Sequence, residues 1–172
     1  EQFVNSQGDI RYLETTKVAY FSDIGQGDAV LGVSVDVTDY KQTAEYLELF
    51  EAVVINANDL IMITKANIDD ENGPTVVYVN EAFTRITGYL RSEIMGKSPR
   101  MLQGKKTSRK ELNNLRVCLQ KGIHYKGELI NYTKDGKEYW VEIVIFPVRG
   151  AQGNVTYYAA LERDITERKQ SE

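Results

Sequence analysis

The spacing of apolar positions changes partway along this chain. Residues 39–57 contain no glycine or proline, and their apolar side chains recur at helical spacing, so this pattern predicts a helix over residues 39–57. After residue 58 the apolar stretches become shorter and richer in β-branched and aromatic residues, which is typical of strands. The predicted strands are Leu60–Thr64, Thr75–Val79, Gly127–Tyr132, Glu138–Val148 and Val155–Ile165.

Helices are predicted between the second and third of these strands. Two are short, Glu81–Thr87 and one near Ser92–Met95, and each is followed by a glycine that can end it. Ser108 and Glu111 form a capping box that opens one long helix, Arg109–Gln120. The order of two strands, short helices, one long helix and three strands joined by tight turns predicts an α+β fold. We expect a five-stranded antiparallel sheet with the helices on one face.

Residues 8–42 align without a gap with residues 136–170, so the chain contains an internal repeat. The identical pairs are Gly8/Gly136, Glu14/Glu142, Gly25/Gly153, Asp36/Asp164, Thr38/Thr166, Lys41/Lys169 and Gln42/Gln170. Glycines in turns and an Asp-x-Thr ending have specific backbone roles, so we interpret the alignment as two copies of one module.

The repeat predicts four segments. Residues 1–38 are the last strands of a truncated first module, and residues 39–57 are a linker helix. Residues 58–166 form a complete module, and residues 167–172 begin an exit helix toward an output domain in the same protein. The chain starts at Glu1 without a signal peptide, so we expect an internal segment of a longer protein.

Two surfaces suggest association with a partner. The linker helix carries Leu47 and Phe50 at coiled-coil spacing, so it either dimerises or lies on its own domain as an amphipathic linker. The strand Glu138–Val148 is apolar on both faces, with Trp140 and Phe146 on the face opposite Val141. One face must cover a core and the other must meet a helix, a domain or a second subunit, so we expect a homodimer.

Composition narrows the range of functions. The 172 residues are 42% hydrophobic and 27% charged, which indicates a globular protein. A net charge of -4 gives no general attraction to nucleic acid or to anionic lipid, and no apolar stretch approaches the roughly 20 residues that span a bilayer. The single Cys118 and the single His124 exclude an intrachain disulfide and the usual zinc sites. We therefore expect no metal site and a cytoplasmic location.

Several short motifs, in this order, resemble the PAS domain family. They are Tyr78-Val79-Asn80-Glu81-Ala82-Phe83, Thr87-Gly88-Tyr89 and Asp164-Ile165-Thr166-Glu167-Arg168-Lys169. The resemblance covers about residues 55 to 166, and the segment 32–38 resembles the end of a preceding PAS domain. It implies a tandem sensor array with a ligand cavity between the sheet and the helices.

Within the family, residues 96–104 resemble those of flavin-binding LOV photosensors. They read Gly-Lys-Ser-Pro-Arg-Met-Leu-Gln-Gly, and Pro99 stands where these sensors carry the cysteine that attacks the flavin. Proline has no nucleophile, so adduct photochemistry is excluded at this position. The resemblance implies that Arg100, Gln103 and Arg116 hold the flavin phosphate and ribityl chain and that Asn131 contacts the ring edge.

The resemblance to LOV domains fails at two ring-edge positions. Val141 replaces a second asparagine, and Glu162 replaces a glutamine. One interpretation keeps a flavin, FMN or FAD, with altered ring contacts and with Tyr125, Trp140 or another aromatic residue packed near the ring. Another has no cofactor, and Arg100 and Arg116 then pair with carboxylates such as Glu111. A third has a different small ligand, so the cofactor stays open.

The Asp-x-Thr ending provides candidates for signal transmission. A short acceptor side chain can cap the exit helix and also bond the preceding backbone, so Asp164 and Thr166 can couple the last strand to that helix. We expect a sensory segment of a bacterial-type signalling protein, by resemblance a sensor histidine kinase or a diguanylate cyclase. The alternative is a cofactor-free dimerisation module. We expect no enzymatic activity in this segment, because the residues supply no nucleophile and base pair.

Overall fold

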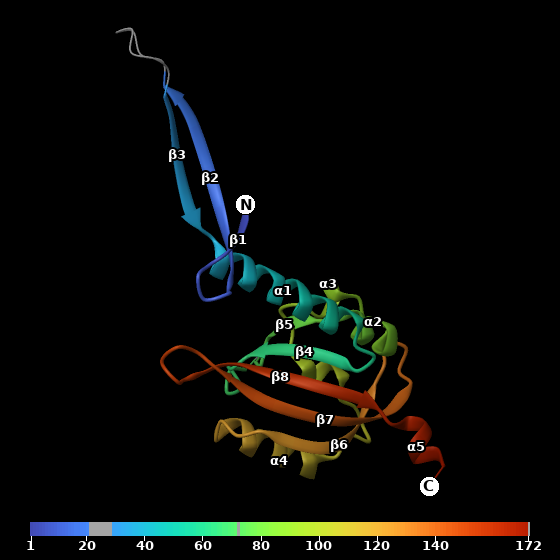
Figure 1. Cartoon of the computed structure of the whole chain (residues 1–172). Coiled ribbons are helices and arrows are strands. Elements are labelled where there is room, and N and C mark those ends of the chain that lie inside the picture. Colours follow the sequence, from blue (N-terminus) through green and yellow to red (C-terminus); the bar gives the residue numbers. More distant parts are fainter. Residues whose placement is uncertain (21–28, 72, 172) are drawn as a thin grey trace. The chain divides into compact units, whose positions relative to one another are not determined.

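The computed structural model describes residues 1–20, 29–71 and 73–171. The chain forms two compact units, Glu1–Ala52 and Val53–Glu172 (Figure 1). The part of the repeat at residues 21–28, which includes Gly25, lies outside the described residues.

The first unit is a three-stranded antiparallel sheet that leads into a helix. Its strands β1 (Gln2–Val4), β2 (Ile10–Tyr20) and β3 (Ala29–Asp36) are neighbours in chain order. Helix α1 (Thr38–Asn56) follows, so the predicted helix is present and begins one residue early. The early start arises because Asp36 accepts hydrogen bonds from both the amide and the hydroxyl of Thr38, at 2.9 and 2.5 Å.

The two copies of the repeat share their strand register as well as their sequence. Gln2 lies opposite Tyr12 in the first unit, and 128 residues later Ile130 lies opposite Trp140. The turns that follow β1 and the strand equivalent to it have glycines with positive φ, which are Gly8 and Gly136. The structural repeat therefore extends to residues 2–4, beyond the stretch in which the sequences match.

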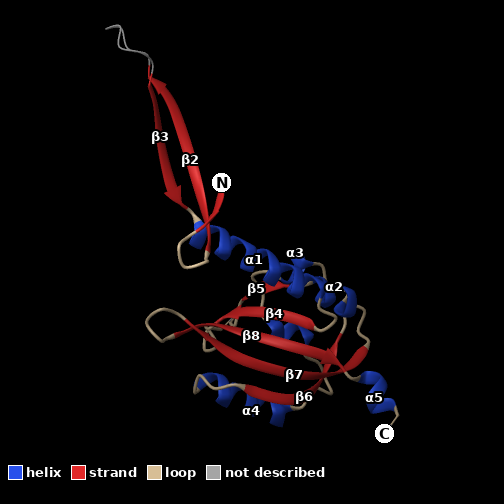
Figure 2. Ribbon diagram, in the orientation of Figure 1, coloured by secondary structure: helices blue, strands red, loops and turns tan. Residues whose placement is uncertain are grey.

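The second unit contains a five-stranded antiparallel sheet in the order β5-β4-β8-β7-β6 (Figure 2). Its strands are β4 (Leu60–Lys65), β5 (Val76–Val79), β6 (Tyr125–Tyr132), β7 (Glu138–Arg149) and β8 (Val155–Asp164). All neighbouring strands are antiparallel. The predicted α+β fold and its sheet are thus confirmed.

The helices of the second unit lie mostly between β5 and β6 in the chain. They are α2 (Glu81–Thr87), α3 (Arg91–Ile94), a 3-10 helix Pro99–Leu102, α4 (Arg109–Gln120) and the terminal α5 (Thr166–Gln170). Helices α2 and α4 have the predicted bounds, and Ser108 caps α4 by accepting from the amide of Glu111 at 3.3 Å. The 3-10 helix was not predicted. It begins with Pro99, whose fixed φ suits a first helical turn, after a cap by Ser98.

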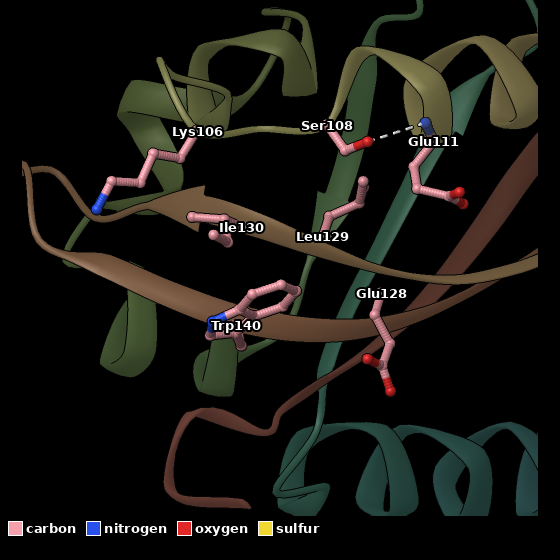
Figure 3. A pocket seen from close by; sticks show the side chains of 7 residues that line it. All are labelled: Lys106, Ser108, Glu111, Glu128, Leu129, Ile130 and Trp140. Atoms are coloured by element: carbon pink, nitrogen blue, oxygen red, sulfur yellow. Dashed lines mark hydrogen bonds between the residues drawn. The ribbon is translucent and has the colours of Figure 1, made fainter. Parts of the chain in front are cut away.

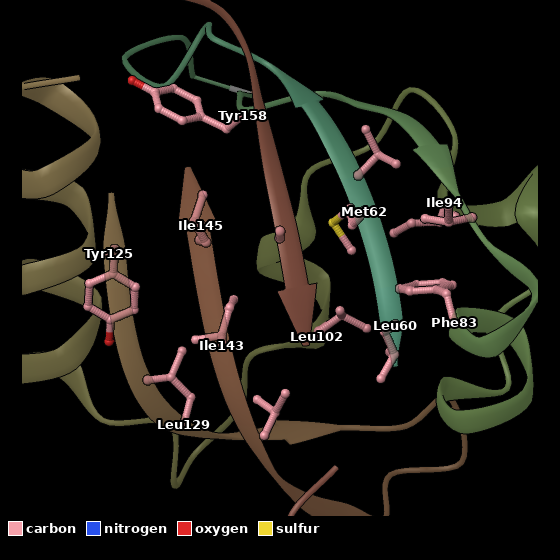
Figure 4. Packing of buried hydrophobic residues seen from close by; sticks show 14 of the residues in the cluster. Leu60, Met62, Phe83, Ile94, Leu102, Tyr125, Leu129, Ile143, Ile145 and Tyr158 are labelled. Carbon is pink, nitrogen blue, oxygen red and sulfur yellow. The ribbon is translucent and has the colours of Figure 1, made fainter. Parts of the chain in front are cut away.

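The core fills the space between the sheet and the helices that precede β6, as Figure 4 shows. Strand side chains such as Leu60 and Ile143 pack against Phe83 of α2, Ile94 of α3 and Leu102 of the 3-10 helix. The core-facing side chains of β7 alternate with half-buried or exposed ones on its opposite face, as its sequence predicts. Helices α2, α3 and α4 and the 3-10 helix therefore cover one face of the sheet, and the cavity described below lies on that face. Helix α5 lies at the other face, where Lys169 stacks over the ring of Trp140.

Candidate functional site

A cavity of about 420 Å³ lies between the inner face of the sheet, α4 and the 3-10 helix. This volume falls in the range of small-molecule sites, which is about 300–1,000 Å³. Strands β4, β6, β7 and β8 all contribute side chains to its lining. The structure brings to this cavity all five residues for which the sequence predicts flavin contacts, namely Arg100, Gln103, Arg116, Asn131 and Glu162.

Glu162 and Asn131 are buried polar residues of the lining. They are 3% and 6% exposed, on β8 and β6 respectively. The Oε2 atom of Glu162 is fully buried and has no hydrogen-bond partner within residues 1–20, 29–71 and 73–171. Burial disfavours the charged form and raises the pKa of the Glu162 carboxyl from 4.5 to about 7. A buried carboxyl with an unused oxygen is a ready partner for a polar ligand group.

Arginines supply the positive charge of the cavity lining. Arg100, Arg109 and Arg116 all line it. The Nη2 atom of Arg116 lies 3.4 Å from Oδ1 of Asp69, and the side chain of Arg116 is 59% exposed. Guanidinium groups suit phosphate oxygens because they offer several donors in a fixed plane. The arrangement can bind an anionic group at one end of a ligand and a polar group near Glu162 at the other.

The interpretation without a cofactor named the wrong carboxylate for these arginines. Glu111 accepts hydrogen bonds from Tyr125 at 3.0 Å and from Asn114 at 3.3 Å. Arg116 instead pairs with Asp69, and Arg100 donates at 3.5 Å to carbonyls in the same loop between β4 and β5. The sequence did not indicate the contact between Arg116 and Asp69, because the two residues are far apart in the chain and only the fold brings that loop beside α4.

The two aromatic residues named for a flavin ring do not line the cavity, whereas another aromatic residue does. Trp140 lies on the opposite face of β7 from the cavity, and Tyr125 is a core residue that does not line it. The aromatic residue in the lining is Tyr158, whose hydroxyl donates to the carbonyl of Leu119 at 2.5 Å. Its alternation with the exposed Tyr157 and Leu161 on β8 is the signal that places it on the inner face.

The positions that depart from the LOV pattern have clear structural consequences. Pro99 lines the cavity, so a residue without a nucleophile stands where the resemblance places the reactive cysteine. Val141 is fully buried in the core and does not line the cavity. Cys118 packs against the core from α4 and is likewise absent from the lining. Asn131 and Glu162 of the lining can therefore form hydrogen bonds with a ligand ring, whereas the lining contains no thiol.

A second hollow lies near the N-terminus of α4, at the sheet edge formed by β6. Its lining consists of Lys106, Ser108, Glu111, Glu128, Leu129, Ile130 and Trp140 (Figure 3). Leu129 points toward α4, whereas Glu128 points away from it. Glu128 pairs with Arg168 and, at 3.0 Å, with Lys169, so its charge is already matched by α5. This hollow carries no group aimed at a ligand.

The Asp-x-Thr ending forms the hydrogen bonds expected of it. Thr166 Oγ accepts from the backbone amide of Trp140 at 2.9 Å, and its own amide and hydroxyl donate to Asp164 at 2.9 and 2.6 Å. Strand β7, strand β8 and helix α5 thus meet at one threonine. The first unit repeats this set of bonds, with Thr38 accepting from the amide of Tyr12 at 2.9 Å.

Of the predicted association residues, Leu47 and Phe50 of α1 are 59% and 62% exposed. On the outer face of the second sheet, Trp140 is half-buried and Phe146 is 39% exposed. Tyr157 and Leu161 of β8 are also exposed on this face. Among the described residues, no helix has the length and apolar character needed to cross a membrane. No cluster of three or more His, Cys, Asp or Glu side chains suited to a metal ion occurs in the same part of the chain.

Comparison with known families identifies this fold. The PAS domain model matches residues 58–167, so the chain belongs to the PAS domain family.

The relatives include a light-activated kinase and a regulatory protein. The blue-light-activated histidine kinase 1 of Erythrobacter litoralis is 37% identical over 102 residues, which cover 58% of this chain and 28% of that protein. The nitrogen fixation regulatory protein of Klebsiella oxytoca is 33% identical over 124 residues, which cover 72% of this chain and 24% of that protein. The chain thus matches about a quarter of the length of each relative.

Solved structures of light-oxygen-voltage proteins have the same fold. An RNA-binding light-oxygen-voltage receptor superimposes with a TM-score of 0.68 at 25% identity, over 93% of this chain and 40% of that one. A light-oxygen-voltage domain studied with a flavin analogue gives a TM-score of 0.63 at 29% identity, over 72% of this chain and 89% of that one. The suspected relationship to PAS domains with LOV-like neighbours is therefore confirmed.

Proposed function

We propose that this chain is a cytoplasmic sensory segment that binds a flavin nucleotide in the cavity of its second unit and passes the state of that cavity to α5. The observation that carries the proposal is the convergence of Arg100, Gln103, Arg116, Asn131 and Glu162 on one cavity. These residues are spread from position 100 to position 162, and the fold of the second unit brings them together. The flavin would supply a chromophore and a redox centre, and the arginines would hold its phosphate.

The route of the signal follows from the strand that carries Glu162. Glu162 lies on β8 two residues before Asp164, which holds Thr166 at the start of α5. A displacement of β8 would therefore change the bonds that fix α5 to β7. An output domain beyond α5 would receive the signal, and the similarity to a blue-light-activated histidine kinase supports a histidine kinase parent.

The first unit has a matching assignment. Its strands, turn glycine and Asp-x-Thr bonds correspond to those at the end of the second unit. We propose that residues 1–38 are the last strands of a preceding PAS domain and that α1 is the linker between the two sensors.

A spectrum tests the flavin assignment. The purified chain should bind FMN, with the visible absorption and quenched fluorescence of a bound flavin. Arg100→Ala and Arg116→Ala should weaken binding, whereas Arg85→Ala on the exposed side of α2 should not, because Arg85 does not line the cavity. Unchanged binding in both cavity variants would refute the phosphate site.

Dimerisation without a cofactor is the second candidate, and the exposed apolar residues of α1 favour it. Light scattering should show a dimer that Leu47→Asp and Phe50→Asp shift toward monomer. Glu48→Gln, at an exposed acidic position between them, should leave the mass unchanged. A monomeric wild-type chain that binds FMN would exclude this alternative for the segment.

A further inference from the structure

We propose that Glu162 binds the ligand as a protonated carboxylic acid and that occupancy of the cavity is thereby coupled to pH. The inference rests on the proposed function, because it concerns the same cavity. It specifies a class of ligand, namely a nitrogen heterocycle with adjacent C=O and N–H groups and an anionic tail. Glu162 is then the residue that selects ligands with these adjacent C=O and N–H groups.

The environment of Glu162 favours the neutral acid. The side chain is 3% exposed, lines the cavity and leaves Oε2 without a partner among the described residues. An ionised carboxylate in this position would lose its hydration without gaining a counter-charge, whereas a neutral acid pays a much smaller desolvation cost. Burial accordingly raises the pKa of this carboxyl to about 7.

The groups around Glu162 do not reverse this preference. From β7, Tyr139 is buried, and burial raises the pKa of its phenol, so Tyr139 remains neutral. On β8 itself, Asp164 is exposed and accepts hydrogen bonds from the amide and hydroxyl of Thr166, so burial is what raises the pKa of Glu162. The cavity residues of β4 and β6 are uncharged. Positive charge enters the lining only from the helices, as Arg100, Arg109 and Arg116.

A protonated carboxylic acid has the hydrogen-bonding pattern of an amide. One oxygen donates through its proton and the other accepts, whereas a carboxylate only accepts. The acid can therefore pair with a ligand edge that has a carbonyl beside an N–H. Flavins and guanine nucleotides both have such an edge together with a phosphate, which the arginines of the lining can bind. Ionisation of Glu162 removes the donor and breaks one of the two bonds.

The sign of the coupling follows directly. A ligand that requires the proton raises the pKa of Glu162 when it binds, so its affinity is full below the pKa of the free protein and declines above it. With a free-state pKa of about 7, the dissociation constant rises about tenfold between pH 6 and pH 8. In the Glu162→Gln variant the amide replaces the acid and cannot ionise, so this component of the pH dependence disappears.

Calorimetric titration of the whole chain with FMN and, separately, with GMP tests the inference. The dissociation constant is measured at pH 6 and pH 8 for wild type, Glu162→Gln, Glu162→Leu and Glu142→Gln. Glu142 is a half-buried glutamate on the outer face of β7, so its variant makes the same chemical change outside the cavity. Ionisation of the ligand phosphate, with a second pKa of about 6, affects every protein equally, so the ratio to Glu162→Gln isolates the contribution of Glu162.

We expect the ratio of the wild-type dissociation constant to that of Glu162→Gln to rise about tenfold from pH 6 to pH 8. The ratio for Glu142→Gln should rise equally, and Glu162→Leu should bind weakly at both pH values. A constant ratio, or equal loss of binding in the Gln and Leu variants, would overturn the inference and leave the flavin proposal intact. Binding of GMP alone with the expected pH dependence would support the inference and overturn the flavin assignment. If neither nucleotide binds at either pH, both are overturned.

Discussion

The threonine that joins β7, β8 and α5 gives the sharpest test of how this domain is held together. Thr166→Val keeps the shape of the side chain but removes the acceptor of the Trp140 amide and the donor to Asp164. An amide that loses its partner in a partly buried place costs about 1–2 kcal/mol, because water replaces the lost bond only in part. The valine should therefore lower the free energy of unfolding of the second unit by this amount.

Urea unfolding followed by tryptophan fluorescence provides the assay. Trp140 is the single tryptophan of the chain and lies beside the changed bond, so its emission reports on the second unit. With an m value of about 2 kcal/mol/M, the midpoint should fall by about 0.5–1 M. Hydrogen exchange should also show faster exchange of the Trp140 amide.

The chain contains its own control for this experiment. Thr38 makes the equivalent bond to the amide of Tyr12 in the first unit, so Thr38→Val is the same chemical change in the other compact unit. It should leave the tryptophan transition unchanged. A midpoint for Thr166→Val that equals wild type, or an equal shift in both variants, would refute the reasoning.

Three further variants test the cavity and its surroundings. Asp69→Asn removes an exposed partner of Arg116, so the affinity for FMN should rise by up to about fivefold, the effect of a surface ion pair. Gly127→Ala should lower the melting temperature, because the added Cβ would lie 2.1 Å from the hydroxyl of Tyr125, whereas Gly32→Ala, whose Cβ would meet its nearest atom at 3.8 Å, should have little effect. Glu162→Gln should change how stability depends on pH. The folded-state pKa of Glu162 is raised from 4.5 to about 7, so its stabilisation of the wild type is full below pH 4.5 and is lost between about pH 4.5 and 7.

Each of these has a contradicting outcome. Unchanged or weaker FMN binding by Asp69→Asn would show that Asp69 does not compete with the phosphate. Equal melting temperatures for Gly127→Ala and wild type would show that Tyr125 moves without cost. Denaturant titrations at pH 5 and pH 8 should give a loss of stability in wild type that is smaller in Glu162→Gln. A parallel loss in the two proteins would contradict the assignment of the buried carboxyl.

Much of the fold could be predicted because local rules and the global arrangement agree. Helix α2 has its cap at Asn80 and its glycine at Gly88, and α4 has its cap at Ser108, so their bounds follow from residues inside a short window. The 3-10 helix Pro99–Leu102 escaped prediction, because a single short turn has no periodicity to detect.

Part of the candidate site could also be predicted from the sequence, and part could not. The family resemblance pointed to Arg100, Gln103, Arg116, Asn131 and Glu162, and the fold gathers them in one cavity. Trp140 and Tyr125 do not line the cavity, and for Trp140 the alternation along β7 already indicated this, since it placed Trp140 on the face opposite Val141. The partner of Arg116 was missed, since Asp69 lies in a loop 47 residues earlier in the chain.

The sequence by itself determined the identity of the elements, the duplicated Asp-x-Thr ending and the replacement of a reactive cysteine by Pro99, because these depend on neighbouring residues and on side-chain chemistry. Only the tertiary structure decided which polar groups share a cavity and which oxygen of Glu162 lacks a partner. Burial and hydrogen-bond satisfaction are properties of contacts between distant segments, and those contacts exist only once the sheet has closed against its helices.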